Sequence, residues 1–202
     1  MIPIKAKSRI GGATGKHLFM PARGLSRARG GNVVLNLFNT PETELALVAE
    51  EYHKAAKLLI EKGVTNDLAA YPIVYLYRHA LELSVKSVLI LGDEAGIVSV
   101  ADPFKYKHKL SGLLPDVKHL FVALHVRDYD RLAEVVSEFE KVDPENQAFR
   151  YTVKKSGGPS IGLGFTFSVA ELAKVLDPVL EQLSCMWYGI RENHKNRLEN
   201  SP

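Results

Sequence analysis

Three ionisable residues near the middle of the chain follow one another at intervals of four positions. They are Arg78, Glu82 and Lys86, so that one acidic side chain has a basic one on either side. On an α-helix, residues four apart differ in direction by only about 40°, and the three side chains therefore share one stripe. Residues 71–91 around them are otherwise mostly apolar. The pattern predicts a narrow polar seam along a helix inside a bundle.

The seam allows two interpretations. Burying an unpaired charge is costly, so the three side chains either neutralise one another or face a wet groove. In the first case Glu82 bridges Arg78 and Lys86, which contributes about 0.2–0.5 kcal/mol per pair when the pair is exposed. In the second case the seam is the floor of a functional groove, because buried charge clusters concentrate at sites.

In the groove hypothesis, further side chains join the seam. His79 falls in the same sector of the helix as Arg78. His108 belongs to a run of basic residues, and Arg150 and Tyr151 follow the next helical region. We expect these side chains to bind phosphate groups of RNA or of a nucleotide. The expected binding residues are Arg78, His79, Glu82, Lys86, His108, Arg150 and Tyr151.

The chain offers no recognisable pattern for a metal or an organic cofactor. Its single cysteine, Cys185, excludes an intrachain disulfide and a thiolate metal cage. Gly11, Gly15 and Lys16 resemble a phosphate loop, but the spacing is too short and His17 stands where Ser or Thr is needed. We therefore expect neither a metal nor a cofactor.

The elements that must position these residues are mainly helices, because apolar residues recur at helical spacing from residue 41 onward. Residues 149–153 and 161–167 instead alternate around a turn-rich loop, which predicts a small β-hairpin. Ser168 caps the last helix, which Pro178 should kink or restart. We expect an all-α or mostly α up-and-down bundle of about five helices, with the hairpin before the last helix and a polar, frayed tail from residue 191.

The composition is typical of a globular protein, and the excess positive charge lies at the N-terminal end of the chain. It has 202 residues, 46% of them hydrophobic and 24% charged, which argues against wholesale disorder. The formal net charge is +3, but residues 1–40 hold seven basic side chains and no acidic one, leaving the remainder at −4. We expect a basic, glycine-rich arm in residues 1–39, either solvated or bound to nucleic acid phosphates, and one domain in residues 40–202.

The chain contains no apolar run near the roughly 20 residues that cross a bilayer, and no apolar core of a secretory signal. We therefore expect a cytoplasmic protein that has no membrane partner.

Three segments carry a resemblance to a known family. Residues 71–86, with their Ala-Leu-Glu-Leu sequence and the lysine that follows it, resemble the second helix of HEPN-like proteins. Residues 108–114 resemble the start of the third helix of that family. Residues 143–151 are similar to a hairpin in uncharacterised bacterial relatives. The likeness covers residues 40–190, in the order that the family has.

The resemblance implies a helical bundle that forms a homodimer and binds RNA or a nucleotide. Many HEPN-like proteins are metal-independent ribonucleases of toxin or defence systems, so an endoribonuclease with a partner protein or antitoxin is an expectation. Their hallmark is an R-x4-6-H motif. This chain lacks that spacing, and its nearest approach is Arg191 and His194.

Arg191 and His194 are the candidate catalytic pair. RNA cleavage without a metal needs a base for the 2′-hydroxyl proton and a cation for the phosphoryl oxygens, which His and Arg supply. At i and i+3 the two side chains share a helix face. The alternative is an ordinary interaction of His194 with the helix dipole. For the whole chain, the alternative function is a non-enzymatic module for protein–protein interaction or dimerisation.

Overall fold

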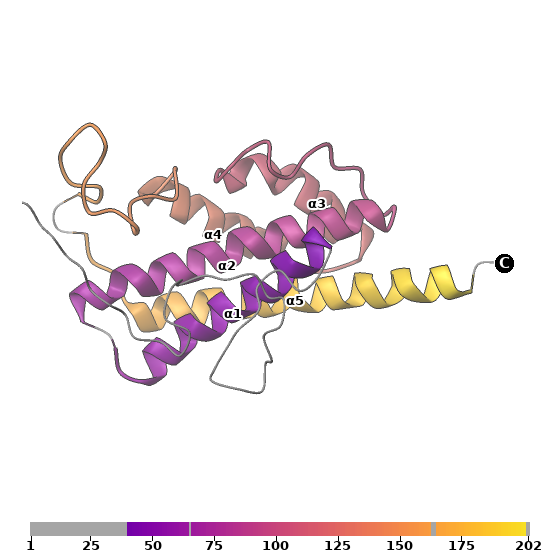
Figure 1. The fold of residues 1–202 in the computed structure, drawn as a ribbon, viewed down its shortest axis with the longest axis horizontal. Coiled ribbons are helices and arrows are strands. Elements are labelled where there is room, and N and C mark those ends of the chain that lie inside the picture. Colours follow the sequence, from indigo (N-terminus) through magenta and orange to yellow (C-terminus); the bar gives the residue numbers. More distant parts are fainter. Residues whose placement is uncertain (1–39, 65, 163–164, 201–202) are drawn as a thin grey trace, which may run out of the picture. The chain divides into compact units, whose positions relative to one another are not determined.

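The computed structural model describes residues 40–64, 66–162 and 165–200. The predicted basic arm lies outside the described residues, which all belong to one unit, Phe38–Pro202. They form five α-helices and a short 3-10 helix, which confirms the predicted mostly α-helical bundle (Figure 1). In chain order the elements are α1 (Pro41–Glu61), α2 (Asp67–Glu94), η1 (Leu110–Leu113), α3 (Leu114–Ala123), α4 (Tyr129–Val142) and α5 (Val169–Glu199).

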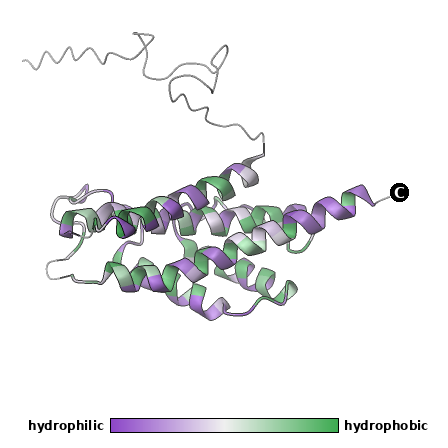
Figure 2. Cartoon of the chain, turned by 90° about the horizontal axis from the view of Figure 1, so that it is seen from below, coloured by the Kyte–Doolittle hydropathy of each residue, from purple (hydrophilic) through white to green (hydrophobic). Residues whose placement is uncertain are grey.

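Helix α2 is the innermost helix of this bundle. It packs against α1, α5, α3 and η1, and its apolar side chains supply much of the core (Figure 1). Ile73, Leu81 and Val88 are completely buried. The last turns of α5, by contrast, are hydrophilic (Figure 2). The predicted central position of residues 71–91 is therefore confirmed.

Helix α2 begins a turn earlier than the apolar run that predicted it. The side chain of Asn66 accepts a hydrogen bond from the Ala69 N–H at 2.9 Å, which satisfies one of the free donors at the helix start. Asp67 adds a negative charge to the first turn, where the helix dipole favours it. This cap fixes where the helix that carries the seam begins.

Helix α5 runs without a break through Pro178 to Glu199, so the predicted restart and the predicted frayed tail are wrong. Proline lacks an N–H, which frees the carbonyl of Lys174 four positions earlier. Arg131 of α4 donates to that carbonyl at 3.1 Å and compensates for the missing bond. Near the C-terminal end, Arg197 donates to the Ala95 carbonyl at 2.8 Å and ties the last turns of α5 to the end of α2.

The predicted β-hairpin before α5 is also wrong. Within the described residues the segment contains one isolated antiparallel bridge, between Val153 and Pro159, and no strand. Gly157 and Gly158 turn the chain with positive φ angles, but Tyr151 and Val153 are 54% and 61% exposed. Alternating residues form a stable hairpin only when one face packs on another layer, and the exposed side chains of Tyr151 and Val153 do not pack in this way.

Among the described residues, no helix combines the length and the apolar character needed to span a bilayer.

Candidate functional site

The seam of α2 is the centre of a buried polar cluster. We call it the Glu82 cluster; it consists of Arg78, Glu82, Lys86, His108 and Asn146. Glu82 is only 3% exposed, and its Oε1 accepts a hydrogen bond from Lys86 Nζ at 2.7 Å. Its Oε2 accepts from Asn146 Nδ2 at 3.1 Å and lies 3.6 Å from Arg78 Nη1. The Glu82 carboxylate thus connects Arg78 and Lys86 of its own helix to Asn146, which lies in the segment after α4.

The two cations of the cluster also hold the backbone that precedes η1. Arg78 Nη2 donates to the carbonyl of His108 at 2.6 Å, and Lys86 Nζ donates to the carbonyl of Lys107 at 2.7 Å. Lys107 has a φ of 51°, in the left-handed region that non-glycine residues rarely adopt. The cluster therefore fixes a two-residue segment in an unusual conformation.

The imidazole of His108 completes the cluster and reaches the surface. Its Nδ1 lies 3.0 Å from Glu82 Oε1 and 3.2 Å from Oε2, and its side chain is 43% exposed. A carboxylate can only accept, so Nδ1 carries the hydrogen and Nε2 of the neutral ring is an acceptor. Among the described residues, none forms a hydrogen bond with Nε2. His108 is thus anchored by one nitrogen and available through the other.

Charges inside the cluster keep Glu82 ionised. Burial by itself raises the pKa of this carboxyl group, but the hydrogen bond from Lys86 and the charges of Lys86, Arg78 and His108 outweigh it. The pKa of Glu82 therefore lies below its ordinary value. Burial lowers the pKa of Arg78, against the opposing charges of Glu82 and the buried Asp143. The two acidic groups balance the two buried cations, so the seam neutralises itself.

A group of aromatic and basic side chains lies next to the cluster. We call it the Tyr75 group; it consists of Tyr52, Tyr75, His79, Arg150 and Tyr151. The His79 ring stacks on Tyr75 with centroids 5.5 Å apart, and Tyr52 meets it edge-on at 4.6 Å. The Arg150 guanidinium lies over the rings of Tyr75 and Tyr151, at 5.6 and 5.5 Å. The group therefore presents a cation held between two tyrosines.

His79 connects the two groups. Burial lowers its pKa, and Glu82, Arg150, His108 and Arg78 all act on it electrostatically. Its Nδ1 is buried and has no hydrogen-bond partner. His79 therefore lies close to members of both groups and stays neutral at lower pH than a free histidine.

Every residue predicted to bind belongs to one of these groups. Arg78, Glu82, Lys86 and His108 are in the Glu82 cluster, and the remaining three are in the Tyr75 group. Whether they bind a ligand stays a prediction. The sequence analysis missed Asn146, because no spacing connects its amide to Glu82.

The predicted catalytic pair lies elsewhere, on the hydrophilic last turns of α5 (Figure 2). Arg191 is exposed and its guanidinium lies 5.1 Å from the centre of the Trp187 ring, while His194 is half-buried. Within the described part of the chain, no hydrogen bond, ion pair or ring contact links either residue to the Glu82 cluster. Their catalytic role stays a prediction.

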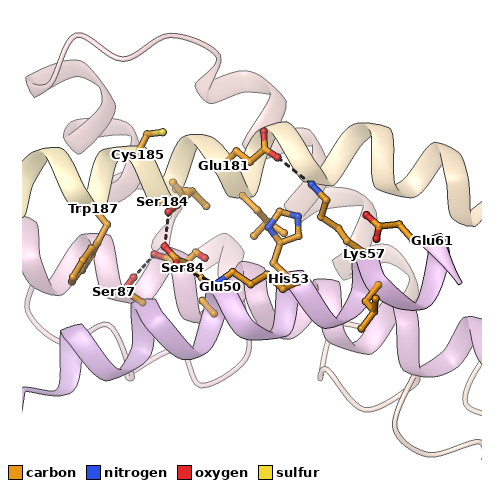
Figure 3. A pocket seen from close by; sticks show the side chains of 16 residues that line it. Glu50, His53, Lys57, Glu61, Ser84, Ser87, Glu181, Ser184, Cys185 and Trp187 are labelled. Carbon is orange, nitrogen blue, oxygen red and sulfur yellow. Dashed lines mark hydrogen bonds and ion pairs between the residues drawn. The ribbon is translucent and has the colours of Figure 1, made fainter. Parts of the chain in front are cut away.

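A groove of about 760 Å³ lies between α1 and α5, with α2 beneath it (Figure 3). Its polar groups pair across the gap: His53 Nε2 lies 2.7 Å from Asp177 Oδ1, and Ser184 Oγ donates to Glu50 at 2.8 Å. Tyr77 donates to Asp177 at 2.8 Å, and burial together with this bond raises the pKa of its hydroxyl. These bonds hold α1 and α2 to α5.

In the described ranges, no group of three or more His, Cys, Asp or Glu side chains is placed to bind a metal ion. Comparison with protein-family models, curated proteins and solved structures finds no match to this chain. The geometry of the Glu82 cluster and the Tyr75 group is therefore the basis for a functional proposal.

Proposed function

We propose that the protein is an HEPN-like, RNA-binding protein of toxin or defence type. Its RNA would bind at the surface formed by His108 and the Tyr75 group. The observation that carries this proposal is that a buried cluster holds a half-exposed histidine, and that this histidine and an arginine over two tyrosine rings both act electrostatically on His79. The resemblance of residues 71–86 and 108–114 to HEPN-like proteins supports the same function.

The charge distribution favours an anionic ligand at this surface. Buried Arg78 and Lys86 are balanced by Glu82 and Asp143, so they do not attract ligands from solution. Within the described residues, several exposed cations of the flanking segments have no acidic partner in an ion pair; they are Lys105, Lys107, Arg150, Lys154 and Lys155. Such side chains bind phosphates by releasing counterions.

The aromatic rings favour single-stranded RNA over a duplex. Unstacked bases of single strands stack on tyrosine rings and on arginine planes, at about 1–3 kcal/mol per base. Tyr151 is 54% exposed, and its ring already carries the Arg150 guanidinium. A base and its phosphate would therefore find a ring and a cation at one place.

The test is binding of the full chain to a fluorescent single-stranded RNA oligonucleotide at several salt concentrations. For single strands, the slope of log affinity against log salt falls by about 0.7 for each phosphate contact. We expect Arg150→Ala to weaken binding and to make that slope less steep by about 0.7, the value for one phosphate contact. Arg127→Ala removes another exposed arginine, outside both groups, and serves as the matched control. Absence of binding, or equal effects of the two variants, contradicts the proposal.

A second candidate function is self-association through the groove between α1 and α5. Glu50 and Lys57 of α1 face this groove, and Leu58 beside them is 52% exposed. An antiparallel α1 from a second copy would place its Lys57 against Glu50 and the reverse, as two-fold symmetry requires. Sedimentation then gives a dimer that Leu58→Glu dissociates, while Leu68→Glu, at a position 79% exposed outside the groove, does not. A wild-type mass of 22.4 kDa contradicts this candidate.

A further inference from the structure

The connection from α2 to η1 contains a stretch in which aromatic and basic side chains alternate. Residues 104–109 read Phe-Lys-Tyr-Lys-His-Lys, and we call them the aromatic–basic segment. Phe104 is 49% exposed and Tyr106 is 39% exposed. A single exposed apolar residue needs no explanation, but two exposed rings interleaved with lysines have the composition of a surface that binds single-stranded nucleic acid.

Hydrogen bonds to neighbouring parts of the protein hold the backbone of this segment. The carboxylate of Asp102 accepts from the Phe104 N–H at 2.8 Å. Toward the other end, Arg78 and Lys86 of α2 donate to two carbonyl oxygens of the segment, at 2.6 and 2.7 Å. The segment is therefore ordered before a ligand arrives, which reduces the entropy that binding costs.

The Phe104 ring lies between a buried cation and the solvent. Lys86 Nζ is 5.2 Å from the centre of this ring, and Lys86 is only 5% exposed. The ring therefore covers part of the Glu82 cluster with one face, and the rest of the side chain is open to solvent. An aromatic ring that the protein supports from one side can stack on the base of a nucleotide with the other.

The Tyr106 ring packs against the backbone of η1. A Cβ added at Gly112 would lie 2.3 Å from Tyr106 Cδ1 and 2.5 Å from Cγ, so the ring fits because residue 112 is glycine. The Nζ of the exposed Lys105 lies 5.6 Å from the centre of the same ring. A base stacked on Tyr106 therefore has a cation close to its phosphate.

Two lysines of the segment are available to phosphates. Within the described residues, neither Lys105 nor Lys107 forms an ion pair with an acidic side chain, whereas Lys109 lies 3.9 Å from Glu145. Both unpaired lysines are exposed. Cations beside aromatic rings attract the phosphates of a single strand and release its counterions.

The position of the rings favours RNA over a lipid surface. Apolar side chains that anchor a protein in a membrane are buried about 5–10 Å into the boundary between headgroups and acyl chains. Here Phe104 rests on Lys86 and Tyr106 rests on Gly112, so neither ring projects freely from the protein. Rings that lie against the protein instead offer a surface on which a base stacks.

We propose that the aromatic–basic segment is a stacking platform for single-stranded RNA. One base lies on Phe104 and another on Tyr106, while Lys105 and Lys107 contact the phosphates. The proposal rests on the proposed RNA-binding function and deepens it, because it adds base stacking at a segment outside the Tyr75 group. Every base has a face that stacks, so the platform accepts any sequence but requires unpaired bases.

The experiment measures the affinity of the full chain for a fluorescent single-stranded RNA, for the same RNA in a duplex, and for inorganic polyphosphate. We expect wild-type protein to bind the single strand more tightly than the duplex. Phe104→Leu and Tyr106→Leu keep an apolar side chain and remove the ring, so each should weaken RNA binding about 5- to 150-fold, the contribution of one stacked base. Neither variant should change the affinity for polyphosphate, which has no bases.

Matched variants separate stacking from a loss of structure. Phe165→Leu, at a ring 45% exposed outside the segment, should bind RNA as wild type does. Gly112→Ala keeps Tyr106 but displaces its ring, because the added methyl group occupies the same space. It should weaken RNA binding as Tyr106→Leu does, with an unchanged Tm, since the half-exposed ring can turn outward. Gly189→Ala, where a Cβ meets no atom within 4 Å, should leave RNA binding unchanged.

The possible results separate this inference from the function on which it rests. Salt-dependent RNA binding that Arg150→Ala weakens, but that Tyr106→Leu and Gly112→Ala leave unchanged, overturns the platform and leaves the RNA-binding function intact. Equal losses for RNA and for polyphosphate also overturn the platform, because stacking requires bases. RNA that does not bind overturns both proposals. Vesicles of phosphatidylserine that bind in place of RNA would identify the segment as a lipid-binding surface instead. Because Phe104 also covers Lys86, the variants at Tyr106 and Gly112 decide the outcome if Phe104→Leu does not fold.

Discussion

Glu82→Gln tests whether the Glu82 cluster is a balanced set of buried charges. The substitution keeps the size of the side chain and removes its charge, so Arg78 and Lys86 remain inside the protein without their counterion. Their side chains are 0% and 6% exposed, so solvent does not screen them. Removing one partner of a buried ion pair costs about 3–5 kcal/mol. For a domain of this size each kcal/mol lowers Tm by about 2–4 °C, which gives a decrease of about 6–20 °C.

Urea unfolding followed by circular dichroism measures this loss. Glu138→Gln is the matched control, because Glu138 pairs with Lys141 at the surface, where both side chains are more than 60% exposed. An exposed pair of this kind contributes about 0–1 kcal/mol. In the double variant Glu82→Gln/Lys86→Met, the loss should be smaller than the sum of the two single losses, because one unpaired charge is gone. If Glu82→Gln is no more harmful than Glu138→Gln, the cluster is not a set of buried charges that depend on one carboxylate.

Three further predictions concern stability. The pKa of Glu82 lies below its ordinary value of 4.5, so the contribution of its carboxylate to folding stability is complete above pH 4.5 and is lost as the pH falls through the folded-state pKa. The midpoint of urea unfolding should therefore decrease below pH 4.5. The decrease should be smaller in Glu82→Gln, which lacks this carboxylate. Ser168→Ala should lower the free energy of unfolding by about 1 kcal/mol, because the Ser168 hydroxyl caps α5 by accepting a hydrogen bond from the Glu171 N–H. Thr40→Ala should have little effect, because the Thr40 side chain makes no capping bond at the start of α1. Thermal unfolding distinguishes the two variants. Gly189→Ala should stabilise the protein by about 0.5–1 kcal/mol, because a Cβ there meets no atom within 4 Å and glycine is unfavourable inside a helix; an unchanged or lower Tm contradicts this.

The helices follow from local patterns, which is why the sequence predicted most of them. Apolar periodicity located α2, and Ser168 with Glu171 located the start of α5. The hairpin failed because alternation between residues 149 and 167 says nothing about whether a second layer covers one face. The restart at Pro178 failed because a distant residue, Arg131, satisfies the carbonyl that the proline leaves free.

By itself, the sequence determined the stripe of Arg78, Glu82 and Lys86, because spacing by four places side chains together on any α-helix. Only the tertiary structure decided what that stripe contacts. Asn146 reaches Glu82 across 64 positions of the chain, and His108 reaches it across 26. Such contacts depend on how the loops return to the helix and on which backbone carbonyl groups accept hydrogen bonds from the buried cations. Local residue spacing predicts neither of these.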